Sequence, residues 1–420
     1  MVCEECKPEF EKLIKKVETL EKRLLVYENA HTPSSLLKKK RPPKNESRGK
    51  LGAPVGHPRY ERKEPKPTMS VEYFEKACPH CRAKLGKPFK IERLIEEEIP
   101  EPRPIEVTEH LIGHYNCPKC KKHIIAKNNA PQGRFGNNLL THVTLLRFDD
   151  RLPLKKTVGS LERHYGITIT DVAVLNATEK VALKLEKPYK GLIRRVRKAN
   201  VIYADETKIK VNGKTYWIWT FVTGKETLFV IRKSRAKKVI EEILGHKFNG
   251  IICCDGWKAY SQYTSSLQRC WAHLLREAKH LAEKFSAFEG FYQAFKEMFE
   301  RIKEVRLKPP SLRVREEIKY KLTLELEQII QQMNYYQEFR KFATKVRNGI
   351  TYWFTCVVNL LVEPTNNIAE RALRELVVQR KIIGGLRREK GANIMQTIMS
   401  MIKTWKQRGL NVFSTMKSNL

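Results

Sequence analysis

The chain has 420 residues, 41% of them hydrophobic, so it can bury a full-sized core and is not disordered throughout. Lys and Arg outnumber Asp and Glu by 81 to 46, and the net charge of +35 indicates a polyanionic partner, most commonly nucleic acid. No apolar run approaches the length of a membrane span and the N-terminus does not resemble a signal peptide, so we expect a cytoplasmic, nucleoid-associated protein without a membrane partner.

Composition and periodicity predict five regions along the chain. They are an N-terminal helix or coiled coil at 1–30, a basic flexible linker at 31–70, a zinc-ribbon-like domain at 71–130, a helical DNA-binding domain at 131–198, and an α/β catalytic domain at 199–420 with a helical insertion at about 274–350.

Apolar side chains between Phe10 and Tyr27 recur at alternating steps of three and four, the pattern of a coiled coil. The run is short, so self-association and docking of a single helix on the body both remain open. Cys3 and Cys6 precede this run, either as metal ligands shared with a partner chain or as an incidental pair. The linker that follows is rich in Lys, Pro and Gly, and either lies on phosphates or stays solvated.

Two Cys-Pro-x-Cys motifs, separated by a strand predicted at Ile105–His110, suggest a zinc ribbon. Four thiolates can hold one tetrahedral Zn²⁺, and a closed four-sulfur shell leaves no open position for catalysis, so this zinc is expected to be structural. The predicted ligands are Cys78, Cys81, Cys117 and Cys120.

Helices are predicted at Leu154–His164 and Thr170–Thr178, joined by a turn around Gly166. This spacing is typical of a helix-turn-helix that places its second helix in the major groove, although simple helix packing without DNA contact gives the same pattern. A basic run then leads into the catalytic domain, and its predicted DNA-contacting residues are Arg194, Arg195, Arg197 and Lys198.

Two buried strands of the catalytic domain are each predicted to end on an acid. The first runs from Val201 to Asp205 and continues into a hairpin whose turn is Asn212-Gly213. The second runs from Gly250 to Asp255, after a third strand and a helix. The resulting mixed sheet of ribonuclease-H type would bring the two carboxylates together at one edge, where open sheets hold their chemistry.

A third acid, Glu370, lies about one turn into a predicted helix that Thr365 or Asn366 caps. Asp205, Asp255 and Glu370 could hold two Mg²⁺ or Mn²⁺ ions for phosphodiester chemistry, with Asp205 as the bridging ligand. Each acid alone also has a purely structural interpretation. The nearest alternative acids are Glu206, Glu363 and Glu375.

The sequence resembles the DDE-type transposases of the insertion-sequence 66 family. The matching segments are Leu139–Leu140, Asp150–Leu154, Ala204–Thr207, Tyr216–Trp219, Cys254–Tyr260, Cys270–His273 and Thr365–Arg374. Trp257 stands where Tyr or Phe is commoner. The resemblance implies a ribonuclease-H-like core, a catalytic metal site at the three acids, cleavage at transposon ends, and transfer of the freed 3′-hydroxyl into target DNA.

The implied partners are double-stranded DNA, as transposon ends and target, and a second copy of the chain, as a dimer or larger. His273 either contacts scissile DNA or is structural, and Arg371 and Arg374 either hold phosphates or lie on a solvated face. Two other functions remain open: a zinc-bearing DNA-binding protein, or a structure-specific nuclease with the same core.

Overall fold

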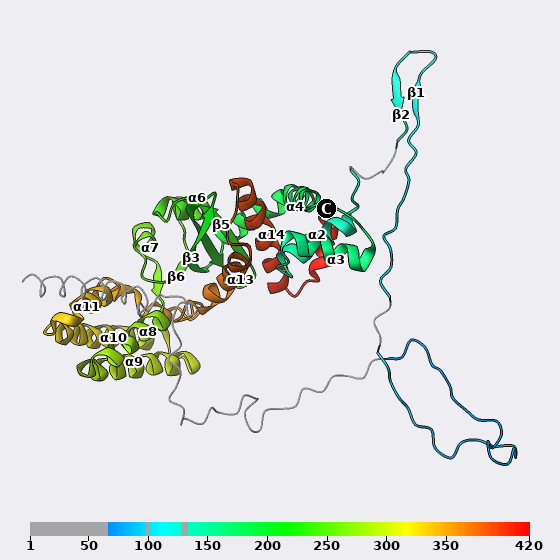
Figure 1. The fold of residues 1–420 in the computed structure, drawn as a ribbon. Coiled ribbons are helices and arrows are strands. Elements are labelled where there is room, and N and C mark those ends of the chain that lie inside the picture. Colours follow the sequence, from blue (N-terminus) through cyan, green and yellow to red (C-terminus); the bar gives the residue numbers. More distant parts are fainter. Residues whose placement is uncertain (1–65, 98–100, 128–132) are drawn as a thin grey trace, which may run out of the picture. The chain divides into compact units, whose positions relative to one another are not determined.

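The computed structural model describes residues 66–97, 101–127 and 133–420 (Figure 1). The predicted coiled coil, Cys3, Cys6 and almost all of the basic linker lie outside this part of the chain. The protein divides into two compact units, Met1–Pro102 and Arg103–Leu420.

In the described part of the first unit, the chain turns tightly around Cys78 and Cys81. A single β-bridge between Ala77 and Lys84 closes the turn. The second unit begins with a hairpin of β1 (His114–Asn116) and β2 (His123–Ile125), which holds Cys117 and Cys120. The strand predicted at Ile105–His110 is wrong, because this exposed segment pairs with no strand.

Four helices follow, and α2 packs against both α3 and α4. Gly166 ends α3 in the left-handed conformation (φ 61°), and the Thr170 hydroxyl caps α4, so the predicted helix–turn–helix order is confirmed. The helices are α2 (Asn137–Phe148), α3 (Leu154–Tyr165), α4 (Asp171–Lys184) and α5 (Glu186–Arg197).

A five-stranded mixed sheet forms the centre of the second unit, in the order β5-β4-β3-β6-β7. The hairpin prediction is confirmed, because Asn212 and Gly213 both adopt positive φ, 49° and 73°. β3 pairs antiparallel with β4 and parallel with β6. The strands are β3 (Val201–Val211), β4 (Lys214–Val222), β5 (Thr227–Arg232), β6 (Ile251–Cys254) and β7 (Leu267–Arg269).

The predicted helical insertion is present between β7 and the third acid, and its helices gather together in Figure 1. Pro309 and Pro310 lie in the break between its two longest helices. The helices on either side of β6 and in the insertion are α6 (Lys237–Leu244), α7 (Lys258–Tyr263), α8 (Trp271–Lys284), α9 (Glu289–Leu307), α10 (Leu312–Met333), α11 (Arg340–Arg347) and α12 (Thr355–Val358), with short 3₁₀ turns at Ser286–Phe288, Gln337–Phe339 and Ile350–Tyr352.

Three C-terminal helices complete the unit: α13 (Asn367–Ile383), α14 (Glu389–Gln407) and α15 (Val412–Ser418). α13 packs on β3 and β4, while α14 covers the edge strand β5. Side chains of α14 spaced four residues apart accept the β5 backbone N–H groups: Gln396 Oε1 from Ile231, Ser400 Oγ from Phe229, and Thr404 Oγ1 from Thr227. Among the described residues, no helix is both long and apolar enough to cross a membrane.

Candidate active site

Strand register brings Asp205 and Asp255 to the same level of the sheet. The parallel pairing of β3 with β6 ends at the pair Tyr203 and Cys253. Each acid follows its paired residue by two positions, Asp205 within β3 and Asp255 directly after the end of β6. The prediction that the first strand ends at Asp205 is wrong, because β4 pairs with β3 as far as Val211. Asp205 therefore sits in mid-strand, where the parallel half of the sheet stops.

The third acid reaches this level because hydrogen bonds fix the start of α13. Asn366, the N-terminal cap residue, does not cap with its side chain as predicted; its Nδ2 donates to the Ala204 carbonyl at 2.7 Å. Just upstream, the Glu363 N–H donates to the Tyr203 hydroxyl at 2.9 Å. Both contacts hold the loop before α13 against β3, and Glu370 follows Asn366 by one helical turn.

The other two acids of the predicted triad both act electrostatically on Asp205. Burial raises its pKa well above the usual value, and the negative charges of Glu206, Asp255 and Glu370 raise it further. One hydrogen bond from the Glu206 N–H opposes this shift. Carboxylates that repel one another in a partly buried cleft are stabilised when a divalent cation binds between them.

Glu206, an alternative acid in the sequence, belongs to a separate buried network. Its side chain is fully buried, and Arg235 donates two hydrogen bonds to Oε1 at 2.8 and 2.6 Å. The Tyr260 hydroxyl donates to Oε2 at 2.7 Å. The Arg235 guanidinium also stacks between two indole rings, 3.8 Å from the centroid of Trp257 and 4.6 Å from that of Trp217.

This network touches the loop that carries Asp255. The Trp257 N–H donates to the Asp255 carboxylate at 2.8 Å, while the Trp257 indole donates to the Arg235 carbonyl at 3.0 Å. Glu206 thus serves as the anchor of Arg235, and Arg235 supports the loop after β6. This role of Arg235 was not predicted from the sequence. The aromatic residues near Glu206 and Asp255 were visible in the sequence, but they do not indicate that one arginine contacts both regions.

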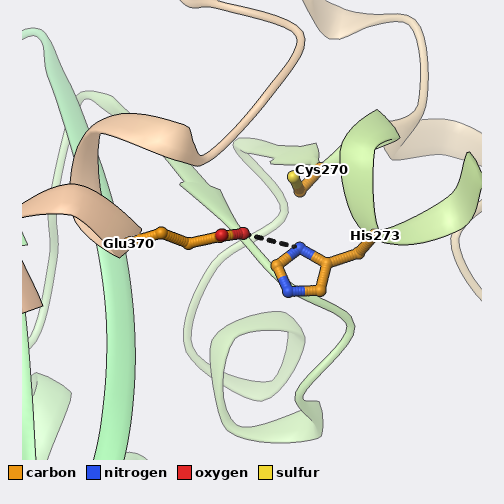
Figure 2. Close-up of side chains that lie close together, drawn as sticks. All are labelled: Cys270, His273 and Glu370. Atoms are coloured by element: carbon orange, nitrogen blue, oxygen red, sulfur yellow. Dashed lines mark ion pairs between the residues drawn. The ribbon is translucent and has the colours of Figure 1, made fainter. Parts of the chain in front are cut away.

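Glu370 lies close to two basic residues of α8, of which Figure 2 draws His273. His273 Nδ1 lies 3.4 Å from one carboxylate oxygen, and Arg276 Nη2 lies 3.7 Å from the other. The buried thiol of Cys270 completes a cluster whose candidate ligand atoms all lie within 4.8 Å of one another. Cys270 and Arg276 were not predicted as site residues, although Cys270 and His273 share the C-x-x spacing of the two cysteine motifs.

The other two alternative acids are held elsewhere. Glu363 pairs with Arg306 at 3.1 Å. Glu375 pairs with Arg151 and with Lys403, and these cations hold the pKa of its carboxyl below the usual value even though burial opposes them. Neither acid raises the pKa of Asp205.

The predicted DNA-contacting residues of α5 and α13 are exposed. Two of them also bind within the protein: Arg195 pairs with Glu226 at 3.0 Å, and Arg197 donates to the last carbonyls of α6, Glu242 and Ile243. Within the described part of the chain, no ion pair involves Arg194, Lys198, Arg371 or Arg374. DNA contact by these residues and by His273 stays a prediction.

The two Cys-Pro-x-Cys turns have the same local geometry. In each, the first cysteine exchanges backbone hydrogen bonds with the residues that follow the motif, and a residue with positive φ, Arg82 or Lys121, comes directly after the second cysteine. Backbone N–H groups of the turn lower the pKa of the first thiol, that of Cys78 in one turn and that of Cys117 in the other. Each turn is therefore built to present thiolates.

The raised pKa of Asp205 predicts that Mg²⁺ binds with release of a proton, and more weakly as the pH falls through that pKa. Without metal, the folded state binds this proton more tightly than the unfolded chain, so stability falls as pH rises from the usual value of 3.8 towards the raised one. Calorimetry in two buffers of different ionisation enthalpy measures the released proton. An affinity for Mg²⁺ that does not change with pH would contradict the prediction. The control variant Glu363→Gln should bind Mg²⁺ as tightly as wild type does.

Sequence comparison identifies the family to which this arrangement belongs. The profile of the transposase IS66 family matches residues 132–394. The chain belongs to the IS66 transposase family. The matched span contains Asp205, Asp255 and Glu370, while all four cysteines of the two turns precede it.

Two relatives of this IS66-family chain come from Sinorhizobium fredii (strain NBRC 101917 / NGR234), and both are described as uncharacterized proteins. One, y4qI, is 23% identical over 320 residues, covering 67% of the chain and 58% of the relative. The other, y4jD, is 22% identical over 396 residues, covering 83% of the chain and 75% of the relative. The chain thus spans less than two thirds of the length of y4qI.

Proposed function

We propose that the chain is a metal-dependent DNA transposase. It cleaves phosphodiester bonds at transposon ends and transfers the freed 3′-hydroxyl into target DNA. The observation that carries this proposal is the placement of the three acids on β3, directly after β6, and in the first turn of α13, a helix that packs on β3. The charges of Asp255 and Glu370 add to burial in raising the pKa of Asp205. The strand order β5-β4-β3-β6-β7, antiparallel on one side of β3 and parallel on the other, supports a ribonuclease-H-like core.

The donor set suits Mg²⁺ or Mn²⁺. These ions take one or two carboxylates and keep water and phosphate oxygens as their other ligands. Glu370 Oε1 is buried and accepts no hydrogen bond from the described residues, so it is available as a ligand atom. We propose Asp205, Asp255 and Glu370 as the metal ligands, with Asp205 shared. When bound, two such ions stabilise the attacking and leaving oxygens of an in-line displacement.

The remaining residues of the site position these acids. Asn366 fixes the first turn of α13 on β3, and Arg276 holds the carboxylate of Glu370 from α8. Arg235 and Trp257 support the loop that carries Asp255. Phosphoryl transfer depends mostly on such positioning and on electrostatic stabilisation, so none of these side chains has to form a bond with the substrate.

The DNA partner is proposed from charge and fold together. A net charge of +35 requires anions nearby, and the exposed basic residues of α5 and α13 are candidates to contact phosphates. The helix–turn–helix of α3 and α4 is a candidate for sequence-specific binding to the terminal repeats of the transposon. Because the reaction joins two ends, we also propose a dimer or larger assembly on DNA.

We further propose that Cys78, Cys81, Cys117 and Cys120 bind one structural Zn²⁺. The support is their spacing and the matching geometry of the two turns. Cys117→Ser is expected to release the tightly held zinc, as measured by elemental analysis after dialysis against a weak chelator. Buried Cys356 in α12 supplies the control, since Cys356→Ala should keep its zinc. Full zinc content in both Cys78→Ser and Cys117→Ser would contradict a four-thiolate site.

A strand-joining assay separates the transposase from its alternatives. A duplex carrying the ends of the element that encodes the chain is incubated with plasmid target and Mg²⁺, and cut and joined products are resolved on a gel. A transposase yields both products. A structure-specific nuclease yields only cuts, and a zinc-bearing DNA-binding protein yields neither while still shifting the duplex.

A further inference from the structure

Cys270, His273 and Glu370 bring three different ligand types to one point (Figure 2). A thiol, an imidazole and a carboxylate have candidate ligand atoms within 4.8 Å of one another, and His273 Nδ1 is 3.4 Å from Glu370 Oε1. Around a tetrahedral Zn²⁺, bond lengths of about 2.0–2.3 Å place neighbouring ligand atoms roughly 3.5 Å apart. Side-chain movement of about 1 Å would therefore bring all three within the coordination distance of one ion.

The backbone holds these ligands in place before any metal arrives. Cys270 is the residue that precedes α8, and its N–H donates to the Cys254 carbonyl at 3.0 Å. Its thiol, only 1% exposed as a residue, accepts the Asn366 N–H at 3.1 Å. Asn366 also begins α13, the helix of Glu370. One hydrogen bond thus joins the elements that supply the thiol and the carboxylate.

The Cys270 segment repeats a feature of the two cysteine turns. Cys270 and His273 have the same spacing as Cys78 and Cys81, because in each pair two residues separate the two candidate ligands. In both segments the backbone N–H groups two and three residues after the first cysteine act to lower the pKa of its thiol, although at Cys270 burial outweighs them and raises that pKa to about 11. Hydrogen bonds of this kind orient a metal-bound sulfur and stabilise its charge.

We propose that Cys270, His273 and Glu370 form a second metal site, selective for Zn²⁺ over Mg²⁺, which withdraws Glu370 from the catalytic ions. Thiolate and imidazole ligands favour Zn²⁺, whereas Mg²⁺ requires oxygen ligands. Binding replaces the S–H bond of Cys270 by a Zn–S bond, and the proton passes to solvent. With three protein ligands the fourth position is open, so the ion is expected to exchange.

Zn²⁺ occupancy is therefore an inhibitory switch on the transposase. The inhibition rests on the proposed function, because it requires Glu370 to act as a catalytic ligand. The binding does not, because it requires only the three side chains. Separate measurements of binding and of inhibition distinguish failure of the second site from failure of the proposed function.

Binding is tested with Co²⁺, whose bond to a thiolate gives a charge-transfer absorption band. The full-length protein with its resident zinc is titrated with Co²⁺, and Cys270→Ser is titrated alongside. Wild type is expected to bind one more equivalent than Cys270→Ser, with the thiolate band present only in wild type. Cys356→Ala, which changes another buried thiol, should match wild type. Equal stoichiometry and equal bands in wild type and Cys270→Ser would overturn the site.

His273→Ala gives an independent test if Cys270→Ser does not fold. The imidazole is partly exposed, with 16% of its side-chain surface accessible, so its removal perturbs the core less. Co²⁺ affinity is expected to fall by about tenfold to a hundredfold or more, since even outer-shell partners of a metal contribute this much. Unchanged affinity in His273→Ala would remove the imidazole from the site and overturn the proposal.

Inhibition is measured as strand joining in fixed Mg²⁺ with increasing Zn²⁺, each variant normalised to its own rate in Mg²⁺ alone. Wild type and Cys356→Ala are expected to lose activity at Zn²⁺ concentrations at least about tenfold below those needed for Cys270→Ser. Excess Mg²⁺ should relieve the inhibition, because the two ions compete for Glu370. Equal sensitivity of wild type and Cys270→Ser would overturn the switch even if the binding result stands.

Discussion

Asp205→Asn is expected to abolish cleavage and strand joining, by a factor of about a thousand or more, equal to about 4 kcal/mol in the activation barrier. Asparagine has nearly the same shape, but its amide lacks the charge that holds divalent ions. DNA binding depends on the basic surface and should survive. Rates in Mg²⁺ and a gel-shift assay on the same duplex measure the two properties, and Glu363→Gln, an acid paired with Arg306, should cleave normally.

The same variant distinguishes a catalytic from a structural role. Because burial and three neighbouring acids raise the pKa of Asp205, its charge destabilises the metal-free fold. Asp205→Asn should therefore melt at the same temperature as wild type, or higher, in buffer without Mg²⁺. Added Mg²⁺ should raise the melting temperature of wild type alone. An unfolded variant, or one that still cleaves, would remove Asp205 from the metal site.

Arg235→Met is expected to destabilise the protein by about 3–5 kcal/mol, because it leaves the buried carboxylate of Glu206 without its cation. Glu206→Gln should cost less, since the amide oxygen still accepts from Arg235 and the amide N–H group can donate to the Tyr260 hydroxyl. The double variant should recover stability relative to Arg235→Met, because no charge remains buried. Urea unfolding of the four proteins gives the coupling free energy.

Lys233→Met is the matched control for Arg235→Met. Lys233 pairs with Glu389 at the surface, where 67% and 64% of the two side chains are exposed, so its loss should change stability by about 1 kcal/mol at most. A loss of similar size in Lys233→Met and Arg235→Met would contradict the buried network. Strand joining should fall only in Arg235→Met, whose side chain supports the Asp255 loop.

The pH dependence of stability adds a signature for Glu206. Burial, followed by the charge of Asp255, raises its pKa from 4.5 to about 7. The folded state then holds the proton more tightly than the unfolded chain, so stability falls as pH rises from 4.5 to about 7. In Glu206→Gln, the free energy of unfolding should change less with pH between 4.5 and about 7. A pH dependence identical to that of wild type would show that other groups cause it.

Local sequence signals anticipated much of the framework. The pair Asn212-Gly213 specified the central hairpin, and Gly166 with Thr170 specified the break between α3 and α4. Each signal is a local backbone requirement, namely positive φ or a side-chain cap. A few neighbouring residues are enough to predict such a requirement. The three acids were predicted as metal ligands because they follow apolar strands or begin a helix, and their role stays a prediction.

Contacts between distant segments were not anticipated. Arg235 meets Glu206 across 29 positions, and Asn366 reaches Ala204 across 162, so no local pattern records either hydrogen bond. The mid-strand position of Asp205 was missed for the same reason, because β4 decides how far β3 extends. Ile105–His110 alternates like a strand, but no strand of the described residues lies beside it to form a ladder, and the Ile105 N–H donates to the Tyr165 carbonyl instead.

The polar stripe on α14 has a consequence for how copies of the protein can meet. Gln396, Ser400 and Thr404 occupy the hydrogen-bonding positions that a sixth strand would otherwise take. An open edge is a template for another chain's strand and leads to uncontrolled polymerisation. Here α14 occupies the position beside β5 that such a strand would take. The β5 edge is therefore closed to strand addition by a second copy of the chain.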